Sequence, residues 1–240
     1  MICLLITSIT AFIFLNTKTY EDWRKDKTMK LSEKLKEYQD QSLKKHIKLV
    51  STQMSKATLN LKETGIEDNA KSSGDVFNNA ILLDLESKEV DLYKLLDGKP
   101  AIISFYRGSW CPYCNLELRA YEALLSKEEN KDVVMIAISP EKPDVTLVEQ
   151  DVSKLNFTVL SDVDNQLAIK LRIMFHLSKA IQLFYGKAVK ISTGTSDHNL
   201  PIPATYVIDG NHKIIKAWVN ADYTKRAEPS EVLDSYRSLK

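Results

Sequence analysis

The chain has 240 residues, 33 basic and 32 acidic side chains, and three cysteines. A hydrophobic fraction of 44% is enough for a buried core, which excludes a wholly disordered chain, and three cysteines are too few for a disulfide scaffold. A net charge of +1 gives no general attraction to nucleic acid, so we expect no nucleic-acid partner. The remaining classes are α/β and α-rich folds of about one domain.

Residues 1–28 form an apolar leader, 1–15, followed by a charged stretch. The apolar run is shorter than the roughly 20 residues of a membrane span, and it lacks the basic start and cleavage site of a signal peptide. Three interpretations stay open: a start placed too early, with Met29 as the working start; a membrane anchor or atypical export signal; or a buried segment. We interpret Cys3, within this leader, as inert.

The missing export signal leads us to expect the protein in the cytoplasm. Membrane anchoring or export through residues 1–15 is the alternative, and membrane contact is expected only if those residues are an anchor.

Residues 29–64 predict an amphipathic helix, because they contain no proline and apolar side chains recur every three to five positions. Ser32 is the expected N-cap. Such a helix either packs on its own domain or serves as a dimerisation arm, so a homodimer stays open. Residues 65–79 are polar, contain two glycines, and predict a linker to a domain over residues 80–240.

Short apolar runs alternate with helical patterns after residue 80. The asparagine and glycine between residues 204–208 and 213–219 indicate a β-hairpin. The resulting order, a β-α-β half followed by a β-β-α half, predicts an α/β, thioredoxin-like fold with an N-terminal helical arm. Strands are expected at 80–85, 101–106, 133–139, 157–160, 204–208 and 213–219, and helices at 112–126, 143–154, 165–171, 177–188 and 228–239.

The strongest chemical motif is Cys111-Pro112-Tyr113-Cys114, directly after a buried strand and at the start of a helix. The N–H groups and dipole of a helix N-terminus stabilise a thiolate, which favours a redox pair in this context. Zinc would need two more ligands, and no second such motif exists. The four histidines are scattered, at His46, His176, His198 and His212.

The residues around this motif resemble a known family. Residues 105–118 (FYRGSWCPYCNLEL) are similar to the active-site stretch of the alkyl hydroperoxide reductase/thiol-specific antioxidant superfamily, in its peroxiredoxin-like branch. Residues 200–209 (LPIPATYVID) resemble the strand that follows the cis-proline of thioredoxin folds, and residues 222–229 (DYTKRAEP) are typical of the branch. The similarity covers roughly residues 29–240.

This resemblance implies roles for individual residues. Cys114 takes the place of the peroxidatic cysteine, Cys111 that of a supporting threonine, and Arg107 that of a proline. No match appears for the family's second arginine. In a thioredoxin alignment Cys111 is instead the exposed nucleophile, and Pro203 is the cis-proline beside the disulfide. Trp110 is expected to be a packing lid, and Arg107 is expected to lower a thiol pKa, bind peroxide or anchor its loop.

The resemblance implies a thiol-dependent peroxidase that reduces hydrogen peroxide or organic hydroperoxides and is re-reduced by thioredoxin or a similar dithiol protein. One alternative is a thioredoxin-like thiol–disulfide oxidoreductase that uses Cys111 as nucleophile. Another is a redox-sensing or interaction protein on the same fold, favoured by the missing threonine and the missing arginine. No bound cofactor or metal is expected, because dinucleotide and phosphate-loop motifs are absent from the sequence.

Overall fold

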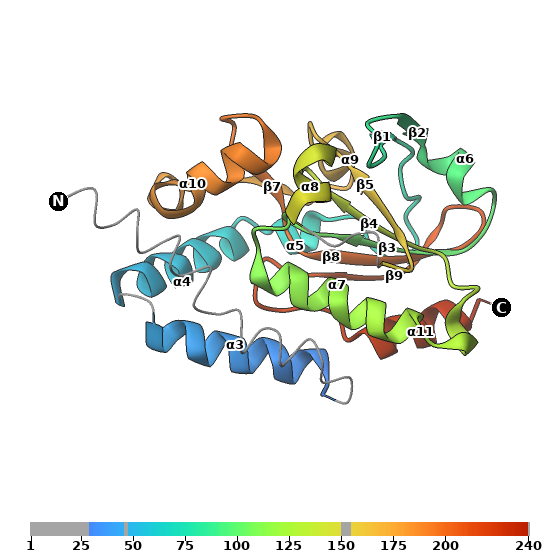
Figure 1. Ribbon diagram of the computed structural model, residues 1–240, viewed down its shortest axis with the longest axis horizontal. Helices are drawn as coiled ribbons and strands as arrows, with labels where there is room; N and C mark the ends of the chain where they lie inside the picture. Colours follow the sequence, from blue (N-terminus) through green and yellow to red (C-terminus); the bar gives the residue numbers. More distant parts are fainter. Residues whose placement is uncertain (1–28, 46–47, 150–154, 240) are drawn as a thin grey trace.

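A computed structural model describes residues 29–45, 48–149 and 155–239, so the leader 1–28 and Cys3 lie outside the described residues. A mixed, seven-stranded sheet crosses the middle of the molecule, and helices lie on both of its faces (Figure 1). This arrangement confirms the predicted α/β, thioredoxin-like fold. Within the described ranges, no helix has both the length and the apolar character needed to span a membrane.

The order of the strands places the cysteine motif near the centre of the sheet. Strand β3 pairs in parallel with β4 and antiparallel with β8, and all three strands are fully buried. Burial on both faces explains their continuous apolar runs. The sheet order is β2 (Glu89–Asp91), β1 (Ile81–Leu83), β5 (Thr158–Ser161), β4 (Met135–Ser139), β3 (Ala101–Phe105), β8 (Ala204–Ile208) and β9 (Ile214–Val219).

Side chains that alternate along β3 fill two separate cores, as the pleat of a strand requires. Ile102 packs with α7 (Pro112–Leu125) and α11 (Pro229–Arg237), and the two helices lie along one face of the sheet (Figure 1). Ile103 and Phe105 pack on the opposite side. The other elements are α5 (Ile66–Asn69), α6 (Leu92–Leu96), η1 (Glu128–Asn130), α8 (Pro143–Glu149), α9 (Gln166–Lys170), α10 (Lys179–Thr193) and the pair β6 (Met174–His176) and β7 (Asn199–Pro201).

The N-terminal arm consists of two helices, α3 (Leu31–Lys45) and α4 (Lys48–Glu63), where the sequence pattern predicts one. Helix α3 packs along α7 through Leu31, Leu35 and Tyr38, which are buried in the same cluster as both cysteines. Helix α4 has no fully buried residue and contacts α10 (Figure 1). The arm therefore belongs to the domain's own packing on the side of the thiols.

The expected N-cap at Ser32 is wrong, because α3 already begins at Leu31. The carboxylate of Glu228 accepts hydrogen bonds from the backbone N–H of Leu31 at 2.9 Å and of Ser32 at 3.1 Å. The first N–H groups of a helix have no partner within it, and a carboxylate there also complements the helix dipole. Glu228, about 200 residues away in the sequence, thus caps the N-terminus of α3.

Replacing Glu228 with alanine is expected to lower the free energy of unfolding by about 1 kcal/mol, the usual cost of a lost cap, and to loosen α3. Chemical denaturation and amide hydrogen exchange of α3 measure the two effects. Glu231→Ala, a change at an exposed position in the first turn of α11, is the matched control. Equal exchange rates in α3 for the two variants would contradict the capping role.

The expected linker at residues 65–79 is instead packed into the domain. Phe77 is fully buried and its ring meets Tyr206 edge-on at 5.4 Å between centroids. The backbone of this stretch also bonds to the hairpin, since Gly74 donates to the carbonyl of Ile214 and Phe77 to that of His212. The polar composition of this stretch predicted a linker, but the buried Phe77 and the backbone hydrogen bonds attach the segment to the core.

Candidate active site

The two cysteines lie where β3 passes through a short loop into α7. Cys111 is the N-cap residue of α7, and Pro112 occupies the first turn, where a fixed φ and a missing N–H are both tolerated. Both thiols are free, and both are buried: Cys111 is 3% exposed and Cys114 is 0% exposed. The start of the helix thus holds both thiols in the interior, so the exposed position that the thioredoxin alignment implies for Cys111 is wrong.

Arg226 supplies a guanidinium to this site from the far end of the chain. Its Nη2 donates to the sulfur of Cys114 at 3.3 Å, and its Nε donates to Oε2 of Glu117 at 2.6 Å. The side chains of this ion pair are only 1% and 2% exposed. The backbone N–H of Arg107 lies 3.5 Å from the same sulfur. Two donors therefore lie at the sulfur of Cys114, within the first turn of the helix.

Sequence reasoning missed Arg226, which lies in the branch-typical string 222–229. The structure brings that arginine to the thiol. Its Nη1 also donates to the carbonyls of Tyr223 and Lys225, which hold the turn before α11. The redox-sensing alternative rests on a missing threonine and a missing second arginine. Arg226 supplies a guanidinium at the thiol, whereas Cys111 still occupies the place of the threonine. The branch-typical string 222–229 was the signal that pointed to it.

Arg107 also lies at the thiols, but in a different setting. Its guanidinium is stacked between the rings of Phe175, at 5.6 Å, and Tyr223, at 4.9 Å. It is buried, and its Nε has no hydrogen-bond partner among the described residues. Burial lowers the pKa of Arg107, whereas the two nearby thiols act to raise it. The prediction that this arginine lowers a thiol pKa is consistent with its charge beside both sulfurs.

The two sulfurs titrate as a pair, since each changes the ionisation of the other. Burial acts to raise the pKa of Cys111, but a hydrogen bond from Cys114 and the charges of Arg107 and Arg226 lower it to about 6. Burial and the neighbouring sulfur raise the pKa of Cys114 well above its usual value. At neutral pH the pair therefore holds one negative charge and one proton, joined by a hydrogen bond between sulfurs.

Glu117 carries a second titratable group in contact with the site. Burial raises the pKa of its carboxyl to about 7, although the paired Arg226 acts to lower it. The pKa of Arg226 is raised, because Glu117 and the thiols outweigh the effect of burial. The guanidinium thus keeps its charge at every physiological pH.

Aromatic rings cover the thiols. Tyr113 meets Tyr38 of α3 edge-on at 5.0 Å and Tyr223 edge-on at 5.3 Å. Trp110 is partly exposed, and its ring packs against that of Tyr185 of α10 at 6.2 Å between centroids; its role as a packing lid stays a prediction. Sequence reasoning missed Tyr38, whose spacing in α3 indicated only a buried helix face. The cover limits direct access to the sulfurs.

Pro203 does not have the conformation that the resemblance implies, because the described residues contain no cis peptide bond. The trans form satisfies the backbone on both sides: Ile202 donates to the carbonyl of Ile173, and Asn220 donates to that of Pro203 at 3.1 Å. The trans isomer of an X–Pro bond is also intrinsically favoured. Pro203 is buried between β7 and β8.

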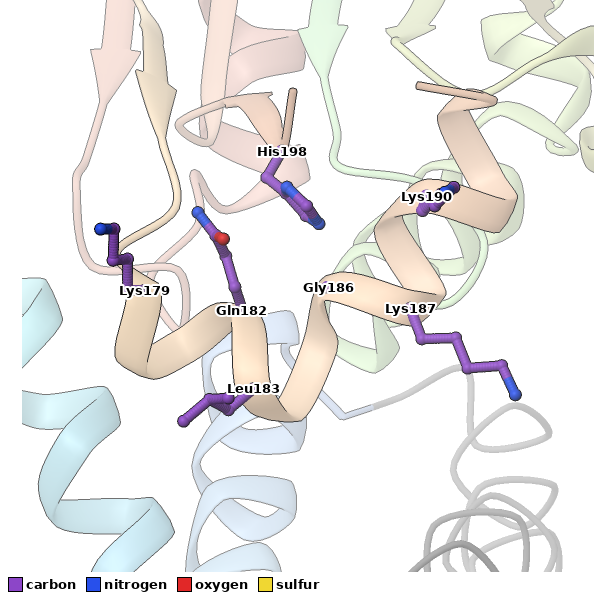
Figure 2. A pocket seen from close by; sticks show the side chains of 7 residues that line it. All are labelled: Lys179, Gln182, Leu183, Gly186, Lys187, Lys190 and His198. Carbon is purple, nitrogen blue, oxygen red and sulfur yellow. The ribbon is translucent and has the colours of Figure 1, made fainter. Parts of the chain in front are cut away.

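A separate depression of about 460 Å³ lies on the outer side of α10 and contains neither cysteine (Figure 2). Figure 2 shows the His198 ring turned toward Gly186 of α10, whereas Leu183 and Lys187 point away from it. Its lysines are exposed, so this is a solvated face rather than part of the thiol site. The depression is lined by Lys179, Gln182, Leu183, Gly186, Lys187, Lys190 and His198.

Comparison with known proteins gives related results by sequence and by structure. The AhpC/TSA family model matches residues 73–217. The thiol-disulfide oxidoreductase ResA of Bacillus thuringiensis is 25% identical over 150 residues, 62% of this chain and 71% of that protein. A putative peroxiredoxin, bcp, of Buchnera aphidicola is 26% identical over 152 residues, 62% of this chain and 94% of that protein.

Among solved structures, the peroxidoxin BcpB of Mycobacterium tuberculosis superposes with a TM-score of 0.54 at 18% identity, over 70% of this chain and 98% of that one. Reduced Prx3 of Vibrio vulnificus, in complex with hydrogen peroxide, gives 0.55 at 17% identity, over 71% and 99%. These likenesses support the fold. Because the family model matches more than half of the chain's residues, the chain belongs to the AhpC/TSA family of peroxiredoxin-like, thioredoxin-fold proteins.

Proposed function

We propose that the protein is a thiol-dependent peroxidase that reduces hydrogen peroxide or an organic hydroperoxide with the Cys111–Cys114 pair. The observation that supports this most strongly is the placement of Arg226. Its guanidinium donates to the sulfur of Cys114 and is held by Glu117, three residues further along α7. A fixed cation beside a thiolate stabilises both the nucleophile and the charge that develops on the peroxide oxygen.

Cys114 is the attacking sulfur in this proposal. The proton shared by the pair moves to Cys111, and the Cys114 thiolate attacks one peroxide oxygen. The O–O bond breaks, Cys114 becomes a sulfenic acid, and the alkoxide leaves and takes up a proton from water. The Cys111 thiol then attacks the sulfur of the sulfenic acid, the S–O bond breaks, and the hydroxide leaves as water with the proton of Cys111. The overall change converts one thiol, one thiolate and one hydroperoxide into a disulfide, an alcohol and hydroxide.

Reduction of the disulfide requires two electrons from outside the chain. A dithiol protein of the thioredoxin kind supplies them by thiol–disulfide exchange. We propose that the reaction takes place in the cytoplasm, with membrane anchoring or export through residues 1–15 as the alternative.

The test is a stoichiometric one on the reduced, full-length protein. Added hydrogen peroxide or cumene hydroperoxide is expected to consume two thiols per molecule of peroxide, with a disulfide between residues 111 and 114 found by peptide mass analysis. Turnover is then expected when thioredoxin, its reductase and a nicotinamide reductant are supplied. Thiols that survive excess peroxide would overturn the proposal.

The rate of the peroxide reaction is expected to fall as the pH drops through about 6. The pKa of Cys111 is lowered to about 6, and only the anionic pair can attack. Roughly nine-tenths of the pairs carry the charge at pH 7 and roughly one-tenth at pH 5, so the rate should drop about tenfold between them. Stopped-flow kinetics with hydrogen peroxide measure the profile. A rate that stays flat from pH 5 to pH 8 would contradict the assigned ionisation.

A second candidate function is thiol–disulfide exchange with Cys111 as nucleophile. The match to ResA of Bacillus thuringiensis and the lowered pKa of Cys111 at the helix N-cap favour it. The same samples distinguish the two functions: rapid reduction of a disulfide substrate such as insulin through Cys111, without reaction toward peroxide, would select exchange over peroxidase activity.

A further inference from the structure

A buried carboxylate that the thiol chemistry does not use lies beside the loop leading into the cysteine pair. Glu141 follows β4, is 0% exposed, and has no ion pair with lysine or arginine among the described residues. A carboxylate is costly to bury without a cation unless hydrogen bonds replace its hydration. The hydrogen-bond donors around Glu141 therefore indicate its role.

Those partners are hydroxyl and amide groups from three separate segments. Oε1 of Glu141 accepts from the hydroxyls of Ser109 and Ser192, both at 2.7 Å, and Oε2 accepts from the hydroxyl of Thr146 at 3.1 Å. The backbone N–H of Ser109 lies 3.1 Å from each carboxylate oxygen. An ionised carboxylate only accepts, so this set of donors suits its charged form.

The largest share of these bonds goes to Ser109, which precedes Cys111 by two residues. The carbonyl of Ser109 is held from the other side by the side-chain amide of Asn115, at 2.6 Å. The backbone N–H of Cys111 donates to the carbonyl of Gly108 at 3.1 Å. Ser109 thus has its N–H, hydroxyl and carbonyl all occupied, which leaves the approach to Cys111 little freedom.

Gly108 makes the loop still less adjustable. Its φ of +140° is open to glycine and rarely adopted by other residues, and an added Cβ would lie 2.7 Å from the Trp110 indole nitrogen and 2.9 Å from the Ser192 hydroxyl. The loop therefore packs closely against Ser192, whose hydroxyl also donates to Glu141.

We propose that Glu141 is a positioning residue, which fixes the loop through Ser109 so that the sulfur of Cys111 stays within bonding reach of Cys114. Holding the two sulfurs together raises their effective concentration toward each other and so favours the disulfide over the open dithiol. Losing the hydrogen bonds between Glu141 and Ser109 should give Cys111 more freedom than Cys114, because Cys111 lies closer to the loop.

A consequence for catalysis rests on the proposed peroxidase function. After Cys114 becomes a sulfenic acid, Cys111 must displace its hydroxide before a second peroxide oxidises the sulfur to a sulfinic acid. A misplaced Cys111 is slower in this step. Loss of the Glu141 contacts should therefore raise the fraction of sulfinic acid formed per turnover.

Three single substitutions separate this role from simple stabilisation of the fold. Glu141→Gln keeps the shape but brings an NH₂ group, so it cannot accept from all of its present donors. Ser109→Ala removes a hydroxyl bond from the loop side. Thr146→Val removes a hydroxyl bond to the same carboxylate from α8, away from the loop, and serves as the matched control.

The first measurement needs no peroxide: the equilibrium between the 111–114 disulfide and dithiothreitol. We expect a shift toward the dithiol of about tenfold for Glu141→Gln, a smaller shift in the same direction for Ser109→Ala, and none beyond about twofold for Thr146→Val. If Glu141→Gln fails to fold, the comparison of Ser109→Ala with Thr146→Val carries the test. The positioning role would be overturned if the equilibrium were unchanged in Glu141→Gln and Ser109→Ala, where they fold. Equal shifts in all three variants would overturn it as well.

The second measurement is the sulfinic acid content of each variant after peroxide treatment, found by mass spectrometry. More sulfinic acid in Glu141→Gln and Ser109→Ala than in the wild type and Thr146→Val supports the role in resolution, and equal amounts contradict it. If no protein reacts with peroxide, including the wild type, the proposed function fails while the dithiothreitol equilibrium still decides the positioning role.

Discussion

Replacement of Cys114 by serine is expected to lower peroxide turnover at least about a thousandfold, because a hydroxyl cannot supply the thiolate that attacks the O–O bond. Cys111→Ser should behave differently. Cys114 remains beside Arg226, so the first step survives and a sulfenic acid accumulates without its resolving partner. The pair of variants thus separates attack from resolution.

Dimedone labelling followed by peptide mass analysis locates the sulfenic acid, and a thioredoxin-coupled assay gives the turnover rates. Thermal melting of both variants serves as the control for folding, since both positions are buried. A sulfenic acid found on Cys111 in the Cys114→Ser protein, and none on Cys114 in the Cys111→Ser protein, would reverse the assigned roles.

Arg226→Gln is expected to slow the peroxide reaction by about a hundredfold and also to destabilise the fold. The kinetic effect follows from the lost donor at the Cys114 sulfur, since removing one fixed donor from a developing charge typically costs that much. The effect on stability follows from Glu117, which is left buried without its cation; breaking such a pair costs about 3 kcal/mol.

The loss of stability in Arg226→Gln should depend on pH. Burial already raises the pKa of Glu117 to about 7, and without Arg226 this pKa rises further above its unfolded-state value. The folded chain then binds the proton more tightly than the unfolded chain, so its stability falls as the pH rises from 5 to 8. Urea denaturation at both pH values measures the difference.

The double variant Arg226→Gln/Glu117→Gln separates the two effects. Removing both charges should restore most of the stability, because no buried ion is left unpaired. Peroxide reduction should stay slow, because the donor to Cys114 is still missing. A double variant that recovers the peroxide rate together with the stability would show that Arg226 acts through the fold alone.

The sequence predicted the central elements of the fold well, and for a clear reason. Apolar runs such as residues 101–106 and 133–139 can be buried on both faces only as inner strands, and the helix after Cys111 has regular spacing and a proline in its first turn. The loop glycine and asparagine between β8 and β9 marked the hairpin. In each case the local pattern and the final packing agree.

The misses arose where a distant residue completes a local structure. Ser32 satisfies the local rule for a cap, yet Glu228 binds the helix N-terminus. Phe77 is one aromatic residue in a polar stretch, and Arg226 approaches Cys114 only when α11 docks beside α7. Sequence spacing carries no information about such contacts, because the tertiary fold alone brings the partners together.

The position of Arg226 has a consequence for how the domain is delimited. The family model ends at residue 217, so a fragment cut to residues 73–217 would retain both sulfurs, Arg107 and Glu117. It would lack the guanidinium that bonds to Cys114, the Tyr223 ring over Arg107, and the α3 residue Tyr38 that covers Tyr113. The thiol chemistry of this protein is therefore a property of the segments on either side of the shared domain as much as of the domain itself.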